Sequence, residues 1–96
     1  MSAPAIDLTG SLDVHVAADV RLALAAAVDA GTGELVIDLR HVDAVDATGL
    51  GVLVGAHRRA QRAGRTLVLT DVPHSVARLL YLTRLDKVLI TRRTAA

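Results

Sequence analysis

Short strand-like runs alternate with segments of helical period along the whole chain, and this alternation most constrains the fold. Runs rich in Val, Ile, Leu or Thr, bounded by Gly, Asp or Pro, are typical of strands and occupy residues 5–8, 35–39, 66–70 and 88–91. Helical periodicity fills the intervals, and it places the following on one face of the first and second helix: Val16, Val20, Leu24 and Val28, then Leu50, Leu53, Val54 and His57. A third helix is predicted to begin near Pro73. Strands separated by helices pair in parallel through crossover connections, so the sequence predicts an α/β fold with a mostly parallel four-stranded sheet.

The chain is long enough for one small domain. Its 96 residues predict a single domain over 5–92, with flexible termini at 1–4 and 93–96. Tyr81 is the one aromatic residue, so the core must consist of Val, Leu, Ile and Ala. The lack of cysteine excludes disulfides and thiol catalysis, and we take the cytoplasm as the expected location. No uncharged stretch approaches the roughly 20 residues that a membrane helix needs.

The start of the second helix carries an unusual set of residues. Asp46 stands where an N-cap is expected, and its carboxylate can accept hydrogen bonds from the free N–H groups of the first turn. Gly51 and Gly55 lie inside the helix, although each costs roughly 1 kcal/mol relative to alanine. The helical period puts small and basic residues on one face: Thr48, Gly51, Gly55, Arg58 and Arg62. This face can receive a partner protein; alternatively, the glycines let the helix lie close to its own sheet or to a neighbouring helix.

Several motifs in the same order resemble one family. The segment DATGLGVLVG at 46–55 is similar to the DSxGLGVLVG signature of anti-sigma factor antagonists, which are small bacterial STAS-domain proteins. LTGSLD at 8–13 resembles the family's LTGELD element, and ARLLYLTRLDKVL at 77–89 resembles its closing helix and strand. The resemblance implies a STAS-like single domain. It also implies that the family's N-terminal strand is missing or reduced here, leaving an exposed sheet edge and room for a homodimer.

The resemblance also implies a function. Such proteins bind an anti-sigma factor, a GHKL-type serine kinase, and thereby free a sigma factor for transcription. The kinase phosphorylates the serine that follows the signature aspartate, which breaks the complex, and a phosphatase reverses the step. Ala47 occupies that serine position and has no hydroxyl, so it cannot be phosphorylated. Thr48 is the substitute candidate, and the sequence leaves open whether Ala47 is natural or an engineered replacement.

A partner-binding surface follows from these motifs. We expect it to comprise Asp13, Val14, His15, Asp46, Ala47, Thr48, Gly49, Leu50, Gly51, Gly55 and Arg58. The alternative function is an accessory STAS subunit of an ABC-type lipid transport system, or another STAS signalling scaffold. Those subunits usually carry threonine directly after the aspartate, whereas this chain carries it one residue later.

Other chemistries find little support. The spacings of the four histidines match no metal-ligand pattern, and no cofactor is expected. Asp13 and Asp46 could form an acid–base pair, but each is better explained as the cap of a helix, and no activated nucleophile accompanies them. We therefore predict a protein that is not an enzyme. One last group is typical of a solvated helix face rather than a nucleic-acid site: Arg58, Arg59, Arg62 and Arg65.

Overall fold

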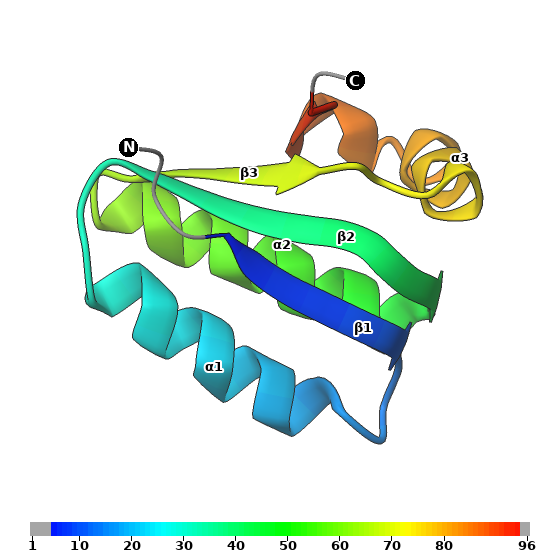
Figure 1. Cartoon of the computed structure of the whole chain (residues 1–96), viewed down its shortest axis with the longest axis horizontal. Helices are drawn as coiled ribbons and strands as arrows, with labels where there is room; N and C mark the ends of the chain where they lie inside the picture. The colour runs from blue at the N-terminus through cyan, green and yellow to red at the C-terminus, as the bar shows by residue number, and fades with distance from the viewer. Residues whose placement is uncertain (1–4, 95–96) are drawn as a thin grey trace.

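A computed structural model describes residues 5–94 of the chain. In chain order the elements are β1 (Ile6–Leu12), α1 (Ala17–Asp29), β2 (Glu34–Val45), α2 (Ala47–Arg62), β3 (Thr66–Thr70), α3 (His74–Leu82), a 3-10 turn η1 (Leu85–Lys87) and β4 (Ile90–Arg92). The strands form one sheet in the order β1-β2-β3-β4, and each neighbouring pair is parallel (Figure 1). The predicted α/β architecture is confirmed.

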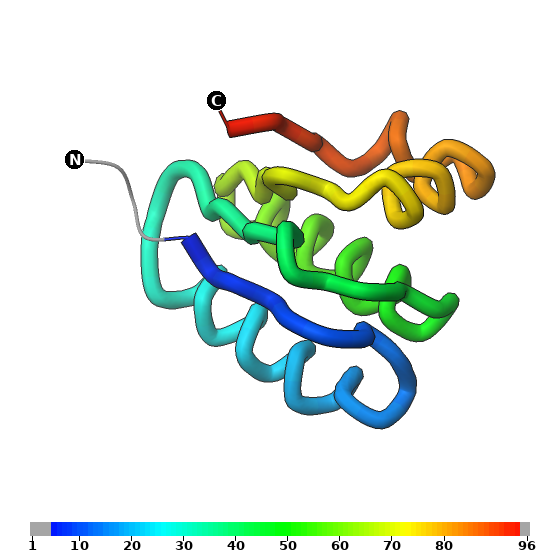
Figure 2. Tube along the Cα trace, turned by 45° about the vertical axis from the view of Figure 1, so that its right-hand side comes forward, coloured from blue at the N-terminus to red at the C-terminus, as the bar shows by residue number. Residues whose placement is uncertain are grey.

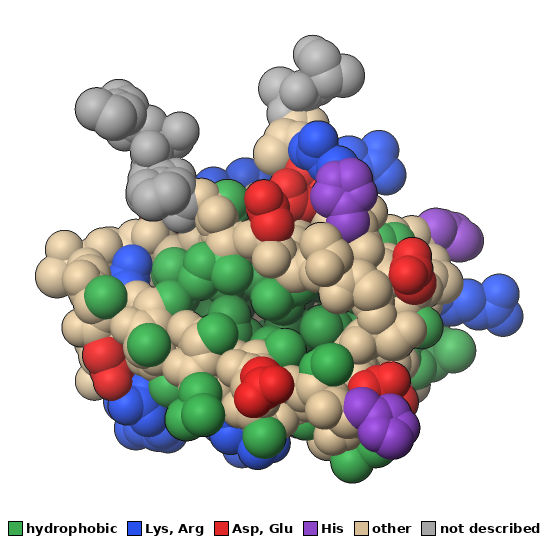
Figure 3. All heavy atoms as spheres, turned by 60° about the horizontal axis from the view of Figure 1, so that its bottom comes forward, with side chains coloured by type: hydrophobic (Ala, Val, Ile, Leu, Met, Phe, Trp, Pro, Cys, Tyr) green, Lys and Arg blue, Asp and Glu red, His purple; other side chains and the backbone are tan. Residues whose placement is uncertain are grey.

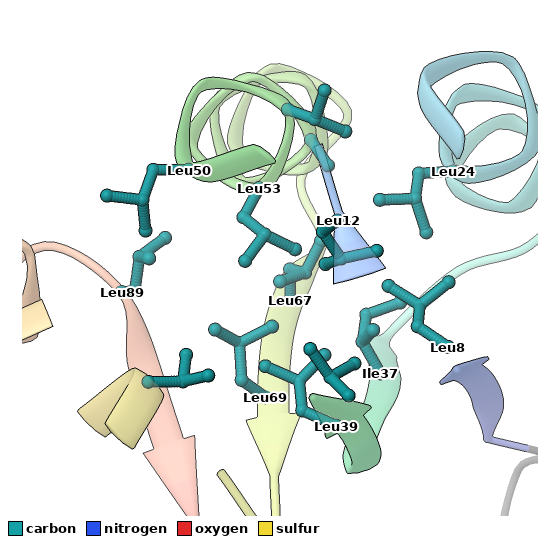
Figure 4. Packing of buried hydrophobic residues seen from close by; sticks show 14 of the residues in the cluster. Leu8, Leu12, Leu24, Ile37, Leu39, Leu50, Leu53, Leu67, Leu69 and Leu89 are labelled. Atoms are coloured by element: carbon teal, nitrogen blue, oxygen red, sulfur yellow. The ribbon is translucent and has the colours of Figure 1, made fainter. Parts of the chain in front are cut away.

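The helices divide unequally around the sheet. Figures 1 and 2 show α1 and α2 side by side against one face, while α3 lies beside η1 at the end of β3. The core fills the space between the sheet and these helices, and Figure 4 shows its leucines pointing toward one another. Completely buried side chains come from α1, β2, α2 and β3, for example Leu24, Leu39, Leu53 and Leu69. The expected core of small aliphatic residues is therefore present.

The second face of the sheet carries ion pairs instead of helices. Arg92 of β4 reaches Glu34 of β2, with nitrogen–oxygen distances of 2.7 and 2.9 Å. Because Glu34 pairs with Thr66 and Arg92 with Thr70, this bridge crosses β3 near Val68. Val68 is completely buried although it lies outside the main core cluster. The bridge thus helps to shield an apolar residue on a face that helices leave open.

Both amino-terminal strands extend beyond their predicted ends. We expected strands at 5–8 and 35–39, whereas β1 continues to Leu12 and β2 to Val45. Two register shifts interrupt their pairing, one between Asp7 and Thr9 and one between Gly10 and Ser11. Such bulges displace the apolar alternation that marks a half-buried strand. The sequence pattern therefore loses its period at the point where the strands go on.

Arg65 was misplaced by the sequence analysis, which assigned it to a solvated helix face. The residue is only 8% exposed and precedes β3. Its guanidinium donates hydrogen bonds of 2.9 to 3.3 Å to five backbone carbonyls, those of Ala27, Val28, Thr32, Gly33 and Glu34. These oxygens belong to the last turn of α1, to the connection that follows it and to the first residue of β2. Arg65, in the connection from α2 to β3, therefore holds that connection against the connection from α1 to β2.

Strand β1 forms an edge of the sheet, since the part of the chain that the structure describes gives it one neighbour, β2. Figure 3 views this side, where apolar side chains gather in a hollow between β1 and α1. A recess of about 370 Å³ is lined there by Ile6, Ala27 and Leu35, among others. The expected exposed edge is thus present in the described residues, and the homodimer that it would allow stays a prediction.

Flexible termini were predicted at residues 1–4 and 93–96. The predicted flexible segments 1–4 and 95–96 lie outside the described residues. Within the expected C-terminal segment 93–96, however, Thr94 is held: its N–H and Oγ1 hydrogen-bond to the Asp71 carboxylate at 2.8 to 3.1 Å.

Among the helices of residues 5–94, none combines the length and the apolar character that crossing a membrane requires.

Candidate docking surface

Asp46 begins α2 as the sequence predicts. Its backbone is extended, with φ −95° and ψ −176°, and its Oδ1 accepts a hydrogen bond from the Gly49 N–H at 2.8 Å. Its own carbonyl accepts the bond from Leu50 N–H at 2.9 Å. The carboxylate thus satisfies a donor that the helix leaves free in its first turn. This cap fixes where the helix starts and which side of its first turn faces outward.

The start of α2 presses against the end of β1. The Asp46 N–H donates to the Leu12 carbonyl at 3.1 Å. A Cβ atom placed on Gly49 would lie 2.2 Å from that same oxygen, far closer than real contacts allow. Gly49 is therefore required for the approach of the helix to the strand. The role of Leu12 escaped the sequence analysis because a backbone carbonyl leaves no signature in a sequence.

Two residues of the predicted surface need correction. Gly49 is buried against Leu12, and Leu50 is only 7% exposed and packs in the core. Their side-chain positions point inward because they lie on the face of α2 that meets β1 and the sheet. They support the surface from below and offer no contact to a partner in this conformation.

The outward face of α2 is open, as the periodicity predicts. Thr48, Gly51, Gly55 and Arg58 are all exposed. A Cβ atom added to Gly51 or to Gly55 would meet nothing within 4 Å. These two glycines therefore do not bring the helix into contact with its own sheet or with a neighbouring helix, and that alternative is wrong. They leave a strip of exposed backbone, which another macromolecule can approach closely.

The turn between β1 and α1 lies next to this helix start. Asp13 is partly buried, while Val14, 64% exposed, and His15 face solvent. The Asp13 Oδ1 accepts a hydrogen bond from the His15 N–H at 2.9 Å. The expectation that Asp13 caps α1 is wrong, because the cap residue is Val16 and makes no side-chain cap bond. Asp13 instead fixes the turn that presents Val14 and His15.

The position after the cap carries no reactive group. Ala47 is exposed at the first residue of α2, and Thr48 beside it is exposed as well. Thr48 brings the only hydroxyl within the first turn of this helix. The predicted surface residues that are not buried define the docking surface used below: Asp13, Val14, His15, Asp46, Ala47, Thr48, Gly51, Gly55 and Arg58.

Ion pairs in other parts of the molecule lower the pKa of three carboxyl groups. A side-chain hydrogen bond from Arg59 holds the pKa of Asp29 below its ordinary value, and Arg40 does the same to Asp71. Arg92 likewise lowers the pKa of Glu34. Within residues 5–94 no three His, Asp or Glu side chains gather as metal ligands would. The docking surface thus combines the open strip at Gly51 and Gly55 with the capped start of α2 and a few polar side chains.

Comparison with known proteins places the chain among relatives. The sequence model of the family described as "Mlab, STAS domain" matches residues 1–91. The chain is 31% identical to the anti-sigma F factor antagonist of Paenibacillus polymyxa over 85 residues, 88% of this chain and 73% of that one. It is also 31% identical to the anti-sigma-B factor antagonist of Bacillus subtilis (strain 168) over 84 residues, covering 88% and 76%.

Solved structures share the fold. The unphosphorylated anti-sigma factor antagonist SpoIIAA superposes with a TM-score of 0.78 at 17% identity, covering 99% of this chain and 84% of that one. The crystal structure of a Thermotoga maritima protein gives a TM-score of 0.80 at 22% identity, covering 93% and 78%. At such identities the likeness establishes the architecture alone.

Proposed function

The chain belongs to the STAS domain family, and on this premise we propose that it is an anti-sigma factor antagonist, which binds an anti-sigma factor through the docking surface. The observation that carries the proposal is the open strip at Gly51 and Gly55 beside a capped helix start. The named relatives are antagonists of anti-sigma factors, which gives the class of partner. Release of a sigma factor, and hence control of transcription in the cytoplasm, follows from this role.

The geometry supports docking rather than catalysis. The Asp46 carboxylate is engaged with the Gly49 N–H and is thus committed to capping. The glycine strip lets a partner approach the helix backbone, while Val14 adds an exposed apolar contact and Arg58 a charge at the rim. We propose that binding requires no rearrangement, because the cap and the Leu12 contact already fix the helix start.

The switch that the resemblance implies is altered at Ala47. A phosphate on the residue after the cap would add about two negative charges to a surface that must be desolvated on docking. Ala47 cannot accept it, so we propose that this chain stays in its binding form in the presence of a kinase-type anti-sigma factor. Thr48 is exposed in the same turn but its side chain leaves the helix about 100° away. We expect incubation with such a kinase and ATP to leave residue 47 unmodified, as read by mass spectrometry. A phosphate mapped to Thr48 would establish the substitute acceptor and contradict the non-switchable form.

A pull-down from a bacterial lysate tests the partner. The tagged chain should retain a small GHKL-type ATPase, and Gly51→Trp should abolish that capture, because the indole fills the strip that the partner backbone must approach. Arg78→Trp provides a matched control, since it places the same bulk on an exposed position of α3 outside the docking surface. Far-UV circular dichroism verifies that both variants fold.

Two results would count against the proposal. Normal capture by Gly51→Trp would remove this face from the interface. Recovery of an ABC-type ATPase in place of the GHKL-type protein would replace the proposed role by the accessory transport subunit.

A further inference from the structure

A cleft of about 140 Å³ lies between α1 and α2, opening to solvent. Arg21 and Ala25 line it from α1, and Gly55, Arg59 and Arg62 line it from α2. Three arginines therefore line one small cleft. From the sequence, Arg59 was assigned to a solvated helix face, Arg62 to that face and to the face that can receive a partner, and Arg21 had no predicted role. Their convergence becomes visible once the two helices are packed against each other.

One of these three arginines is already paired. Arg59 donates from Nε to Asp29 Oδ1 at 3.0 Å and from Nη2 to Asp29 Oδ2 at 2.6 Å. Arg21 and Arg62 form no ion pair or side-chain hydrogen bond with any residue from 5 to 94. After the Asp29 charge is counted against Arg59, the cleft retains a charge of about +2. Like charges that line one cleft repel one another, and an anion bound between them reduces that repulsion.

The wall between the arginines is made of small residues. Ala25 is partly buried and Gly55 carries no side chain, with nothing within 4 Å of an added Cβ. An anion can thus reach the helix surface without steric obstruction. A water molecule occupies about 30 Å³ in the liquid, so the cleft has room for the four oxygens of one phosphate group. Bulkier polyanions would have to extend out of the opening.

We propose that this cleft binds a small phosphate-bearing anion, either free phosphate or the phosphate group of a monoester, held by Arg21 and Arg62 with support from the remaining donors of Arg59. The planar fork of arginine matches the oxygens of phosphate and forms short, charge-assisted hydrogen bonds. The site is distinct from the capped start of α2, although Gly55 belongs both to the cleft and to the docking surface. Its test does not depend on the proposed function, because it measures direct binding to the isolated chain.

Titration of the whole ¹⁵N-labelled chain with inorganic phosphate tests the site. At low ionic strength the amide signals of Gly55 and Ala56 should shift and saturate, with a dissociation constant in the millimolar range. Arg21→Gln and Arg62→Gln should each weaken binding about five- to tenfold, because each removes one of the two unpaired guanidinium groups. Arg58→Gln is the matched control: it removes the same charge from α2 at a position outside the cleft.

The results would distinguish a phosphate monoester from free phosphate as the ligand, and both from the absence of a site. Tighter binding of a nucleoside monophosphate than of phosphate would identify a monoester ligand, and equal binding would identify the phosphate group alone. Absence of saturable shifts would overturn the inference, as would equal shifts with chloride at matched ionic strength. A loss of affinity in Arg58→Gln as large as in Arg21→Gln would reduce the effect to general surface charge. Circular dichroism of each variant establishes that the fold is retained.

Discussion

Replacing Gly49 by alanine tests how closely the docking helix approaches the sheet. The new Cβ would lie 2.2 Å from the Leu12 carbonyl oxygen and 2.9 Å from its carbon. Both atoms belong to the backbone, so no side-chain rotation can relieve the contact. The helix start and the end of β1 must separate by roughly 1 Å, which is the shortfall from ordinary van der Waals contact. That shift also stretches the bond from Asp46 N–H to Leu12 O, now 3.1 Å.

The size of the effect follows from three contributions. Overpacking of a close contact costs about 1–3 kcal/mol, and loss of the Asp46 hydrogen bond adds about 1 kcal/mol. The better helix propensity of alanine offsets about 1 kcal/mol. We expect Gly49→Ala to destabilise the fold by about 2 kcal/mol. Gly51→Ala, two residues further along the same helix, meets nothing within 4 Å and should stabilise it by up to about 1 kcal/mol.

Urea denaturation followed by far-UV circular dichroism measures both variants, since a single tyrosine makes fluorescence a poor probe. In thermal unfolding the same free energies correspond to a Tm lowered by about 8–16 °C for Gly49→Ala and raised by about 4–8 °C for Gly51→Ala. If Gly49→Ala proved as stable as the parent chain, the contact with Leu12 would not exist in solution. The account of how α2 is positioned would then fail.

Three further expectations concern stability. Arg65→Met leaves five carbonyls without their donor and should reduce the free energy of unfolding by about 3 kcal/mol; an unchanged urea midpoint would contradict that role. Asp46→Ala removes the cap of α2 and should cost about 1 kcal/mol by the same assay, with Asp46→Asn close to the parent. Arg40 holds the pKa of Asp71 below its ordinary value, so its stabilising effect is present at neutral pH and is lost as pH falls below about 4. Asp71→Asn should therefore flatten the acid limb of the stability–pH curve, and an unaltered limb would refute the assignment.

The main elements were accessible from periodicity because the buried face of each helix and strand repeats regularly. Leu53 and His57 lie inside, on the face that the period predicts, and the buried His57 Nδ1 has no hydrogen-bond partner among residues 5–94. The ends of β1 and β2 were not accessible. Their register shifts break the alternation, and polar residues such as Arg40 and His41 continue a strand that has one face open to solvent. The lengths of β1 and β2 are therefore set by their pairing with each other, which the local sequence pattern does not encode.

The sequence predicted those parts of the docking surface whose role depends on a side chain or, at glycine, on the absence of one. The Asp46 cap and the open strip at Gly51 are of this kind. Gly49 was assigned to the surface because the sequence gives no means of telling a glycine that faces solvent from one that faces a carbonyl. Arg65 was missed for a related reason. Its partners are backbone oxygens, and the sequence shows only an arginine near other arginines.

The open strip of α2 has a consequence for how such a surface diverges over evolutionary time. Thr48, Gly51 and Arg58 are exposed, and an added Cβ at Gly51 meets nothing within 4 Å, so we expect recognition rather than folding to limit their replacement. Gly49, one position away from Thr48, is limited by folding alone. Duplicated copies of this gene could therefore acquire new partners by exchanging the outer residues while the inner glycine keeps the frame constant. Which partner each copy binds would then depend on a few exposed positions along α2.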